Sequence, residues 1–226
     1  MSSPIAIINK SSLKKMIISF HRKASHNKRT NLLANLLADQ IQQHSEEAKI
    51  SCLDVGCGDM VIAERINELS PSTTWKCIDI HALPAELTGT DKWKKYSQFD
   101  GTHIPFKDKE FDFVIFCDVL HHTPENTLKL LVEASRVGKV VLIKDHFEYG
   151  FVSRQMLRLM DFIGNWSYGI NVPQKYFNEK ELSEICHKIE AKNVTIKRDI
   201  DLYAHLPVVR NILSKKWQFI AVIKTK

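Results

Sequence analysis

Two glycines and two acids stand close together where a chain could cradle a ligand. The stretch LDVGCGDM places Gly56 and Gly58 directly after an apolar run, with Asp54 two residues before the first glycine. Glycines at a strand-to-helix turn let the backbone approach a ligand that a side chain would exclude. A dinucleotide would need a third glycine where Val61 stands, and Asp59 would repel its pyrophosphate. The acids therefore indicate a different ligand.

Acids at the next two strand ends favour a ligand with positive charge. Asp79 and Asp100 end the second and third predicted strands. S-adenosylmethionine has no phosphate and carries a sulfonium cation, which nearby carboxylates stabilise. Asp79 can accept hydrogen bonds from both ribose hydroxyls, and Asp100 can reach the adenine amino group. Acids in this order at consecutive strand ends predict an S-adenosylmethionine site.

Three histidines are candidates for proton transfer. His146 follows Asp145, and His121 and His122 follow the fourth apolar run. An oxygen that accepts a methyl group must lose its proton, and histidine is the natural base near neutral pH. We expect His146 to be the base ahead of the other two; a structural or surface role is the alternative for each. The adjacent pair has no third ligand at a metal-binding spacing, so we predict no metal site.

A scaffold of alternating strands and helices must position these residues. Strands that are apolar along their whole length, separated by helical patterns, predict a parallel sheet covered on both faces. The predicted strands are 50–55, 74–80, 94–100, 111–120, 139–145, 193–203 and 217–224. The predicted helices after the first strand are 61–69, 124–137 and 178–189. Asn178 followed by Glu181 predicts a capping box at the last of them.

The N-terminal segment carries the basic character of the chain. The net charge of the 226 residues is +6; residues 1–30 hold seven Lys and Arg and no acid, so the rest sums to −1. Leu13, Met16, Ile17 and Phe20 recur at helical spacing and predict a basic amphipathic helix, with a second helix from about 30 to 43. We expect residues 1–45 to form an arm that is a lid, a solvated face, a contact for an anionic substrate or a membrane contact. Its basic residues include Lys14, Lys15, Arg22, Lys23, Lys28 and Arg29.

The segments LDVGCGD, CIDI and FDGTHIPFKDKEFDFVIFCDVLHH resemble the class I S-adenosylmethionine-dependent methyltransferases, in particular their small-molecule branch, over about residues 48–145. The resemblance implies a Rossmann-like, seven-stranded, mostly parallel α/β sheet with an antiparallel last strand and helices on both faces. It implies that Asp54, Gly56 and Gly58 bind the methionine part of the cofactor and that Asp79 and Ile80 bind the ribose. It also implies that Asp100 and Gly101 bind the adenine and that Asp118 and Val119 line the methionine side. Met60 departs from the pattern, because the family often has a third glycine there.

We predict a methyltransferase domain at 46–226 that transfers a methyl group to a small or amphiphilic molecule. An aromatic-rich cap at 146–178 would form a wall of a partly apolar acceptor pocket, a structural lid or part of the core, or both. The alternatives are an RNA methyltransferase and a non-catalytic binding protein. A nucleic-acid partner is disfavoured because the aromatic residues are not interleaved with basic ones. Five scattered cysteines and the lack of a long apolar run predict a cytoplasmic protein without an integral membrane segment, of open oligomeric state.

Overall fold

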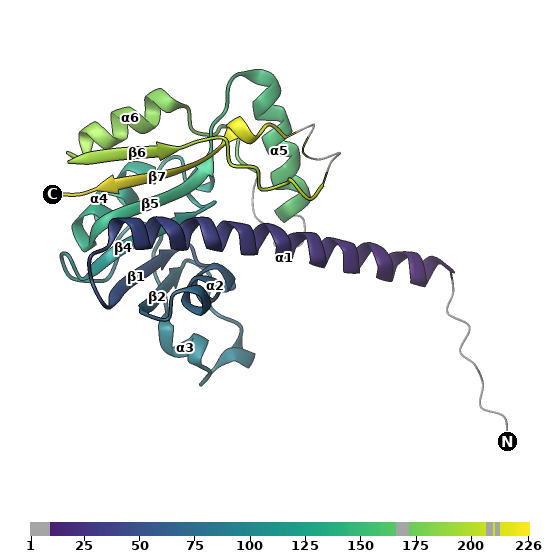
Figure 1. Cartoon of the computed structure of the whole chain (residues 1–226), viewed down its shortest axis with the longest axis horizontal. Coiled ribbons are helices and arrows are strands. Elements are labelled where there is room, and N and C mark those ends of the chain that lie inside the picture. The colour runs from purple at the N-terminus through teal and green to yellow at the C-terminus, as the bar shows by residue number, and fades with distance from the viewer. Residues whose placement is uncertain (1–9, 166–171, 207–209, 211–212) are drawn as a thin grey trace.

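The centre of the molecule is a seven-stranded sheet in the order β3-β2-β1-β4-β5-β7-β6 (Figure 1). The computed structural model describes residues 10–165, 172–206, 210 and 213–226, and the side chains of these ranges apart from 10–26 and 163–165. The strands are β1 (Ile50–Val55), β2 (Thr73–Asp79), β3 (Tyr96–Gln98), β4 (Phe111–Cys117), β5 (Gly138–His146), β6 (Asn193–Lys197) and β7 (Gln218–Lys224). Strands β1 to β5 pair in parallel, and β7 pairs antiparallel with both β5 and β6. The predicted fold class is confirmed.

Helices cover both faces of the sheet, as predicted. They are α1 (Lys10–His44), α2 (Val61–Leu69), α3 (Asp91–Lys95), α4 (Thr127–Val137), α5 (Phe151–Asn165) and α6 (Glu179–Lys188), with single 3₁₀ turns η1 (Ala85–Leu87), η2 (Leu120–His122) and η3 (Lys215–Trp217). Successive side chains of a strand point to opposite faces, so Cys52 packs with α1 and α2 while Leu53 packs with α4 and α6. Two buried apolar clusters result, one on each side of the sheet.

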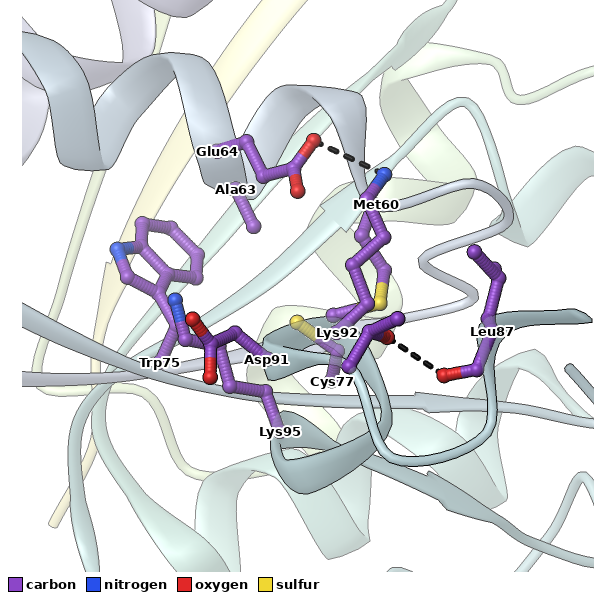
Figure 2. A pocket seen from close by; sticks show the side chains of 10 residues that line it. Met60, Ala63, Glu64, Trp75, Cys77, Leu87, Asp91, Lys92 and Lys95 are labelled. Carbon is purple, nitrogen blue, oxygen red and sulfur yellow. Dashed lines mark hydrogen bonds and ion pairs between the residues drawn. The ribbon is translucent and has the colours of Figure 1, made fainter.

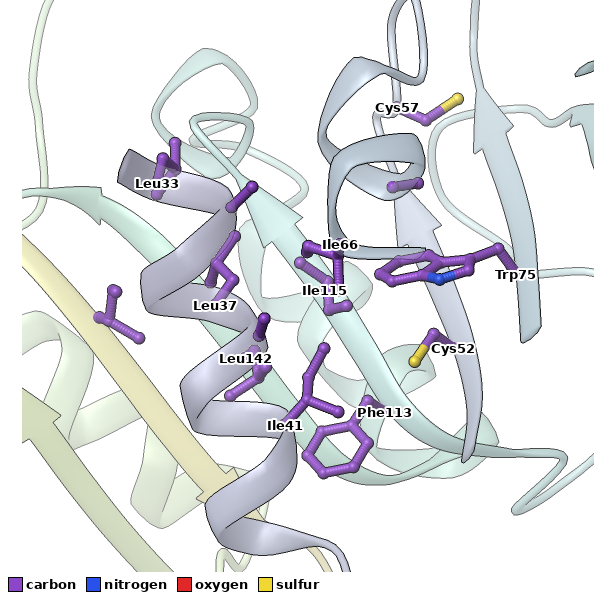
Figure 3. Close-up of a cluster of buried hydrophobic side chains, with 14 of the residues drawn as sticks. Leu33, Leu37, Ile41, Cys52, Cys57, Ile66, Trp75, Phe113, Ile115 and Leu142 are labelled. Carbon is purple, nitrogen blue, oxygen red and sulfur yellow. The ribbon is translucent and has the colours of Figure 1, made fainter. Parts of the chain in front are cut away.

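A single helix, α1, replaces the two helices predicted for the N-terminal segment. No Gly or Pro stands between residues 20 and 30 to end a helix there. Its second half buries Leu33, Leu37 and Ile41 in the cluster that also holds Trp75 (Figure 3), while its first half extends past the sheet in Figure 1. The side chains at positions 10–26, which include most of the predicted basic arm, lie outside the described residues. The division of the chain at residue 45 stays a prediction.

The segment after β5 differs in part from the prediction. The segments MDFIGN (160–165) and YGINVP (168–173) contain the Gly, Asn and Pro that are typical of tight turns, but MDFIGN is the end of α5, because a glycine inside a helix costs only about 1 kcal/mol. The matching YGINVP stretch lies mostly outside the described residues, as do Trp166 and Tyr168. The capping box is confirmed: the Asn178 side chain accepts a hydrogen bond from the Glu181 backbone N–H at 2.9 Å.

The aromatic residues of this segment divide between core and surface. Phe147 is fully buried and stacks on Phe219 with ring centroids 3.9 Å apart. Tyr176 and Phe177 are also buried, whereas Tyr149, Phe151 and Phe162 are exposed. Phe147 and Phe177 therefore have the structural role that we weighed for the cap. None of the helices in the described part of the chain is long and apolar enough to cross a bilayer.

Candidate active site

The glycine turn after β1 places its two glycines in left-handed conformations, with φ of +74° at Gly56 and +51° at Gly58. A Cβ atom on Gly56 would lie 2.6 Å from Cγ2 of Val119, so this glycine allows the turn to contact the segment after β4. A Cβ atom on Gly58 would meet nothing within 4 Å. The close approach at Gly56 is thus to the protein itself, and the open space lies at Gly58.

We expect Gly56→Ala to lower the free energy of unfolding by about 2–5 kcal/mol, from a strained φ and the contact with Val119. Gly58→Ala should cost only the strain, about 1–2 kcal/mol. In the double variant Gly56→Ala, Val119→Ala, removal of the two Cγ atoms should recover the packing share. A double-mutant cycle by urea denaturation measures this coupling; strictly additive costs would contradict the contact.

Met60 occupies the position where a third glycine is frequent, and it has a left-handed φ of 65° that favours glycine. Its side chain is 1% exposed and lines a cavity of about 230 Å³. Figure 2 shows Met60, Trp75, Cys77 and Leu87 around this space. The cavity lies between α2, β2 and α3, and none of the predicted cofactor-binding residues lines it. Burial of Met60 offsets the strain at the start of α2.

Two carboxylates lie under the turn. Asp79 is 8% exposed; its Oδ2 accepts a hydrogen bond from the Gly58 N–H at 2.9 Å and its Oδ1 one from the His81 N–H at 3.0 Å. Burial, and then the charges of Asp79 and Asp59, raise the pKa of Asp54 to about 7. Among the described residues, no Lys, Arg or His forms an ion pair with Asp54 or Asp79. These two carboxylates therefore fit a ligand that carries its own positive charge.

The residues predicted for the adenine, Asp100 and Gly101, follow β3, and Ile80, predicted for the ribose, follows β2. A Cβ atom on Gly101 would lie 3.1 Å from Cγ2 of Ile80, so these two residues are neighbours, and Ile80 is half-exposed. Oδ1 of Asp100 accepts the backbone N–H of His103 and of Thr102, both at 2.7 Å. These hydrogen bonds lower the pKa of Asp100. Asp100 thus shapes its own loop beside an exposed apolar surface.

Asp118 is held by two cations from distant parts of the chain. Its Oδ2 lies 2.7 Å from Nη2 of Arg29 on α1, and its Oδ1 pairs with the ammonium of Lys144 on β5. Burial alone would raise the pKa of Asp118, but Lys144 and Arg29 hold it well below its usual range. Lys144 is fully buried, and sequence reasoning missed it because it lies within an apolar strand. Arg29, one residue of the predicted arm, brings α1 over this edge of the sheet.

The histidines form a cluster beside this ion pair. The carboxylate of Asp145, next to His146 in sequence, contacts both histidines: its Oδ1 lies 2.6 Å from Nδ1 of His121 and 3.5 Å from Nδ1 of His146. Burial alone would lower the pKa of His121, but Asp145 raises it. Nδ1 of His146 lies 3.5 Å from an oxygen of Asp118 and has no hydrogen-bond partner among the described residues. Burial and the charge of Lys144 lower the pKa of His146.

Two further residues of the cluster were not predicted. The Tyr176 hydroxyl donates a hydrogen bond to Asp161 of α5, and its ring centroid lies 5.4 Å from that of His121 and 6.2 Å from that of His146. Burial and the Asp161 carboxylate raise the pKa of Tyr176. Helical periodicity alone gives no sign that Asp161 turns toward the sheet.

The seven-stranded sheet, with a glycine turn after β1 and acids at the strand ends, is the Rossmann-like fold that solved methyltransferase structures share. Residues 53–140 match the sequence model of a family described as "Methyltransferase domain". This match covers less than half of the chain and, together with the fold, agrees with the resemblance to the class I S-adenosylmethionine-dependent methyltransferases that the sequence indicated.

Solved structures with the same fold include the CurJ carbon methyltransferase (TM-score 0.60, 14% identity, 87% of this chain and 54% of that one). A second is the YcgJ protein from Bacillus subtilis (TM-score 0.55, 16% identity, 85% of this chain and 98% of that one). A third is a putative sarcosine dimethylglycine methyltransferase from Galdieria sulphuraria (TM-score 0.60, 15% identity, 85% of this chain and 84% of that one). The chain thus spans about half the length of the CurJ enzyme. A search of curated proteins found no match. At these identities the neighbours show the fold alone.

Proposed function

We propose that the protein transfers a methyl group from S-adenosylmethionine to a small or amphiphilic molecule. The observation that carries the proposal is the pair of buried carboxylates at the glycine turn, Asp54 and Asp79, which no cationic side chain of the described residues neutralises. A sulfonium and an ammonium would supply the missing charge, whereas a pyrophosphate would be repelled.

Each predicted cofactor contact has a place in this proposal. Asp54, Gly56 and Gly58 hold the methionine part. Asp79 and Ile80 bind the ribose, Asp100 and Gly101 bind the adenine, and Asp118 and Val119 line the methionine side. When bound, the cofactor supplies the electrophilic methyl group; the protein holds the acceptor in line with it and excludes water. Arg29, which crosses from α1 to Asp118, closes this edge against solvent.

His146 is the base in this proposal. It is 7% exposed at the carboxyl end of β5, and its Nδ1 faces Asp118 without a hydrogen bond. A buried neutral imidazole with an unpartnered nitrogen can take the proton of an acceptor hydroxyl. His121 is turned to Asp145 and His122 lies beside it, with ring centroids 4.1 Å apart, so both are less suited to this role.

A small acceptor is favoured over RNA because two cations beside the proposed site, Arg29 and Lys144, are both paired with Asp118. A phosphate backbone needs free cations along a groove. Two of the structural neighbours are named for action on carbon and on small amines, in line with such an acceptor. Turnover of an RNA, or no cofactor binding at all, would favour the alternative readings.

Calorimetric titration tests the cofactor site. We expect S-adenosylmethionine to bind and NAD not to bind. Asp79→Ala should weaken binding by about 1–3 kcal/mol, about 5–150-fold, since buried ribose hydroxyls would lose their acceptor. Asp108→Ala, at an exposed acid paired with Arg136, is the matched control and should bind normally. An unchanged dissociation constant in Asp79→Ala would remove the ribose assignment.

Cofactor affinity should rise with pH through about 7, the pKa to which burial raises Asp54. Below this pKa the carboxyl is mostly protonated, and a cationic cofactor binds the ionised form better, so binding must release a proton. The affinity should change by up to about 10-fold per pH unit on the acid side. Calorimetry in two buffers of different ionisation enthalpy measures the released proton. Asp54→Asn should remove this pH dependence; a variant that retained it would exclude Asp54 as its source.

A further inference from the structure

We propose that His121, His122 and Asp161 bind a divalent transition-metal ion such as Zn²⁺. Their ligand atoms all lie within 4.8 Å of one another. The spacing of the two histidines in the sequence offered no third ligand, and the fold supplies one from α5. This inference is independent of methyl transfer, and its test does not measure that reaction.

His121 is held in the orientation of a metal ligand. Its Nδ1 is 2.6 Å from Asp145, so the proton of a neutral ring resides there and leaves the lone pair on Nε2. A carboxylate behind a histidine is the usual support of a metal-binding imidazole, since it sets the ring orientation and makes the other nitrogen more basic. The side chain is 1% exposed, and Nε2 has no hydrogen-bond partner among the described residues.

The distance between the first two ligand atoms suits one shared ion. Nε2 of His121 lies 3.5 Å from Oδ2 of Asp161, too far for a good hydrogen bond. Zinc bonds of about 2.0–2.2 Å at tetrahedral angles place two ligand atoms about 3.3–3.5 Å apart. The alternative trio of His121, Asp145 and His146 is less suitable, because its 2.6 Å contact is a hydrogen bond with no room for an ion.

The remaining groups complete the ligand set. His122 follows His121 on η2, and their rings lie side by side. Tyr176 donates its hydroxyl proton to Oδ2 of Asp161, which leaves this carboxylate oxygen a second lone pair for an ion. Three protein ligands leave a fourth tetrahedral position for water or another small ligand. Two imidazoles with one carboxylate favour zinc and its first-row neighbours over Mg²⁺ or Ca²⁺.

The competing explanation of this cluster is a second proton on the His121 ring in place of a metal ion. A doubly protonated His121 would join Asp145 and Asp161 without any metal ion, and the distances of the cluster allow it. The two arrangements differ in one measurable respect: only the metal site needs His122.

Titration of the chelator-treated full-length protein with Co²⁺ tests the proposal. We expect one ion per chain with the visible absorption of a tetrahedral nitrogen and oxygen site, no thiolate charge-transfer band from the five cysteines, and displacement by Zn²⁺. His122→Ala and Asp161→Ala should each weaken binding about 100-fold or more, and Tyr176→Phe, which removes a supporting hydrogen bond, about 10-fold.

The matched control is His103→Ala. His103 also pairs with a carboxylate, with Nδ1 2.8 Å from Glu133, but on the surface and in neither candidate cluster. It should bind Co²⁺ as the wild type does. Asp161→Asn tests the same ligand with a side chain of unchanged shape. Circular dichroism confirms that each variant is folded. The proposal would be overturned in favour of a protonated His121 if the wild type bound no stoichiometric ion, or if the His122 and Asp161 variants bound Co²⁺ as tightly as the wild type does.

Discussion

We expect Asp118→Asn to lower the free energy of unfolding by about 3–5 kcal/mol, because it leaves the fully buried ammonium of Lys144 without its carboxylate. The guanidinium of Arg29 would lose the same partner, but it is 23% exposed and can turn toward water. Chemical denaturation measures the difference. Lys144→Met tests the asymmetry: it removes the buried charge itself, so it should cost much less and can even stabilise the fold.

The pH dependence of this loss has a definite sign. Asp118 has a folded-state pKa below its unfolded value of about 3.9. Its contribution is therefore fully present above that unfolded pKa and is lost as the pH falls through the folded one. The difference between wild type and Asp118→Asn should be constant near neutral pH and shrink in acid. Asp91→Asn, at an exposed pair with Lys94, is the control and should be indistinguishable from wild type. A similarly small effect at Asp118 would mean that Lys144 finds water or another partner.

We expect His146→Gln to lower kcat by about 100–10,000-fold, the usual share of a general base, with the cofactor dissociation constant unchanged. Glutamine retains hydrogen-bonding groups but cannot take a proton at neutral pH. Formation of S-adenosylhomocysteine from an acceptor with a hydroxyl group, found by screening phenols and other small alcohols, measures kcat. Separate titration of the cofactor distinguishes lost chemistry from lost binding.

The surface variant His103→Gln is the matched control and should keep full activity, since the His103 side chain is exposed, pairs with Glu133 and belongs to neither histidine cluster. A variant His146→Gln with normal kcat would show that the base lies elsewhere or that the acceptor needs none. Loss of cofactor affinity in the same variant would instead assign His146 to the cofactor side of the site.

The placement of the residues proposed to bind the cofactor was predictable, because it depends on local order along the chain. Gly56 and Gly58 follow a buried strand directly, and Asp79 ends the next one. Parallel strands bring their carboxyl ends to the same edge, so residues at successive strand ends must meet. The hydrogen bond from the Gly58 N–H to Asp79 is the direct result. The strand predicted to continue to residue 120 ended at Cys117, since Asp118 adopts a φ of 57°.

The acid–base half could not be read in this way. Asp145 and His146 are adjacent, but nothing in their order shows that Asp145 also meets His121 from the turn after β4: Oδ1 of Asp145 lies 2.6 Å from Nδ1 of His121 and 3.5 Å from Nδ1 of His146. Asp161 and Tyr176 reach the same cluster from a helix and a loop. No spacing in the sequence links them.

The sequence by itself determined the sheet, its glycine turn and the acids at the strand ends, because a period of two within strands and the parallel order of strands already place those residues together. Only the tertiary structure decided which charges pair: Arg29 and Lys144 with Asp118, and His121 with Asp145. Such pairs join segments far apart in the chain, and their partners are chosen by how α1, η2 and α5 pack over the edge of the sheet.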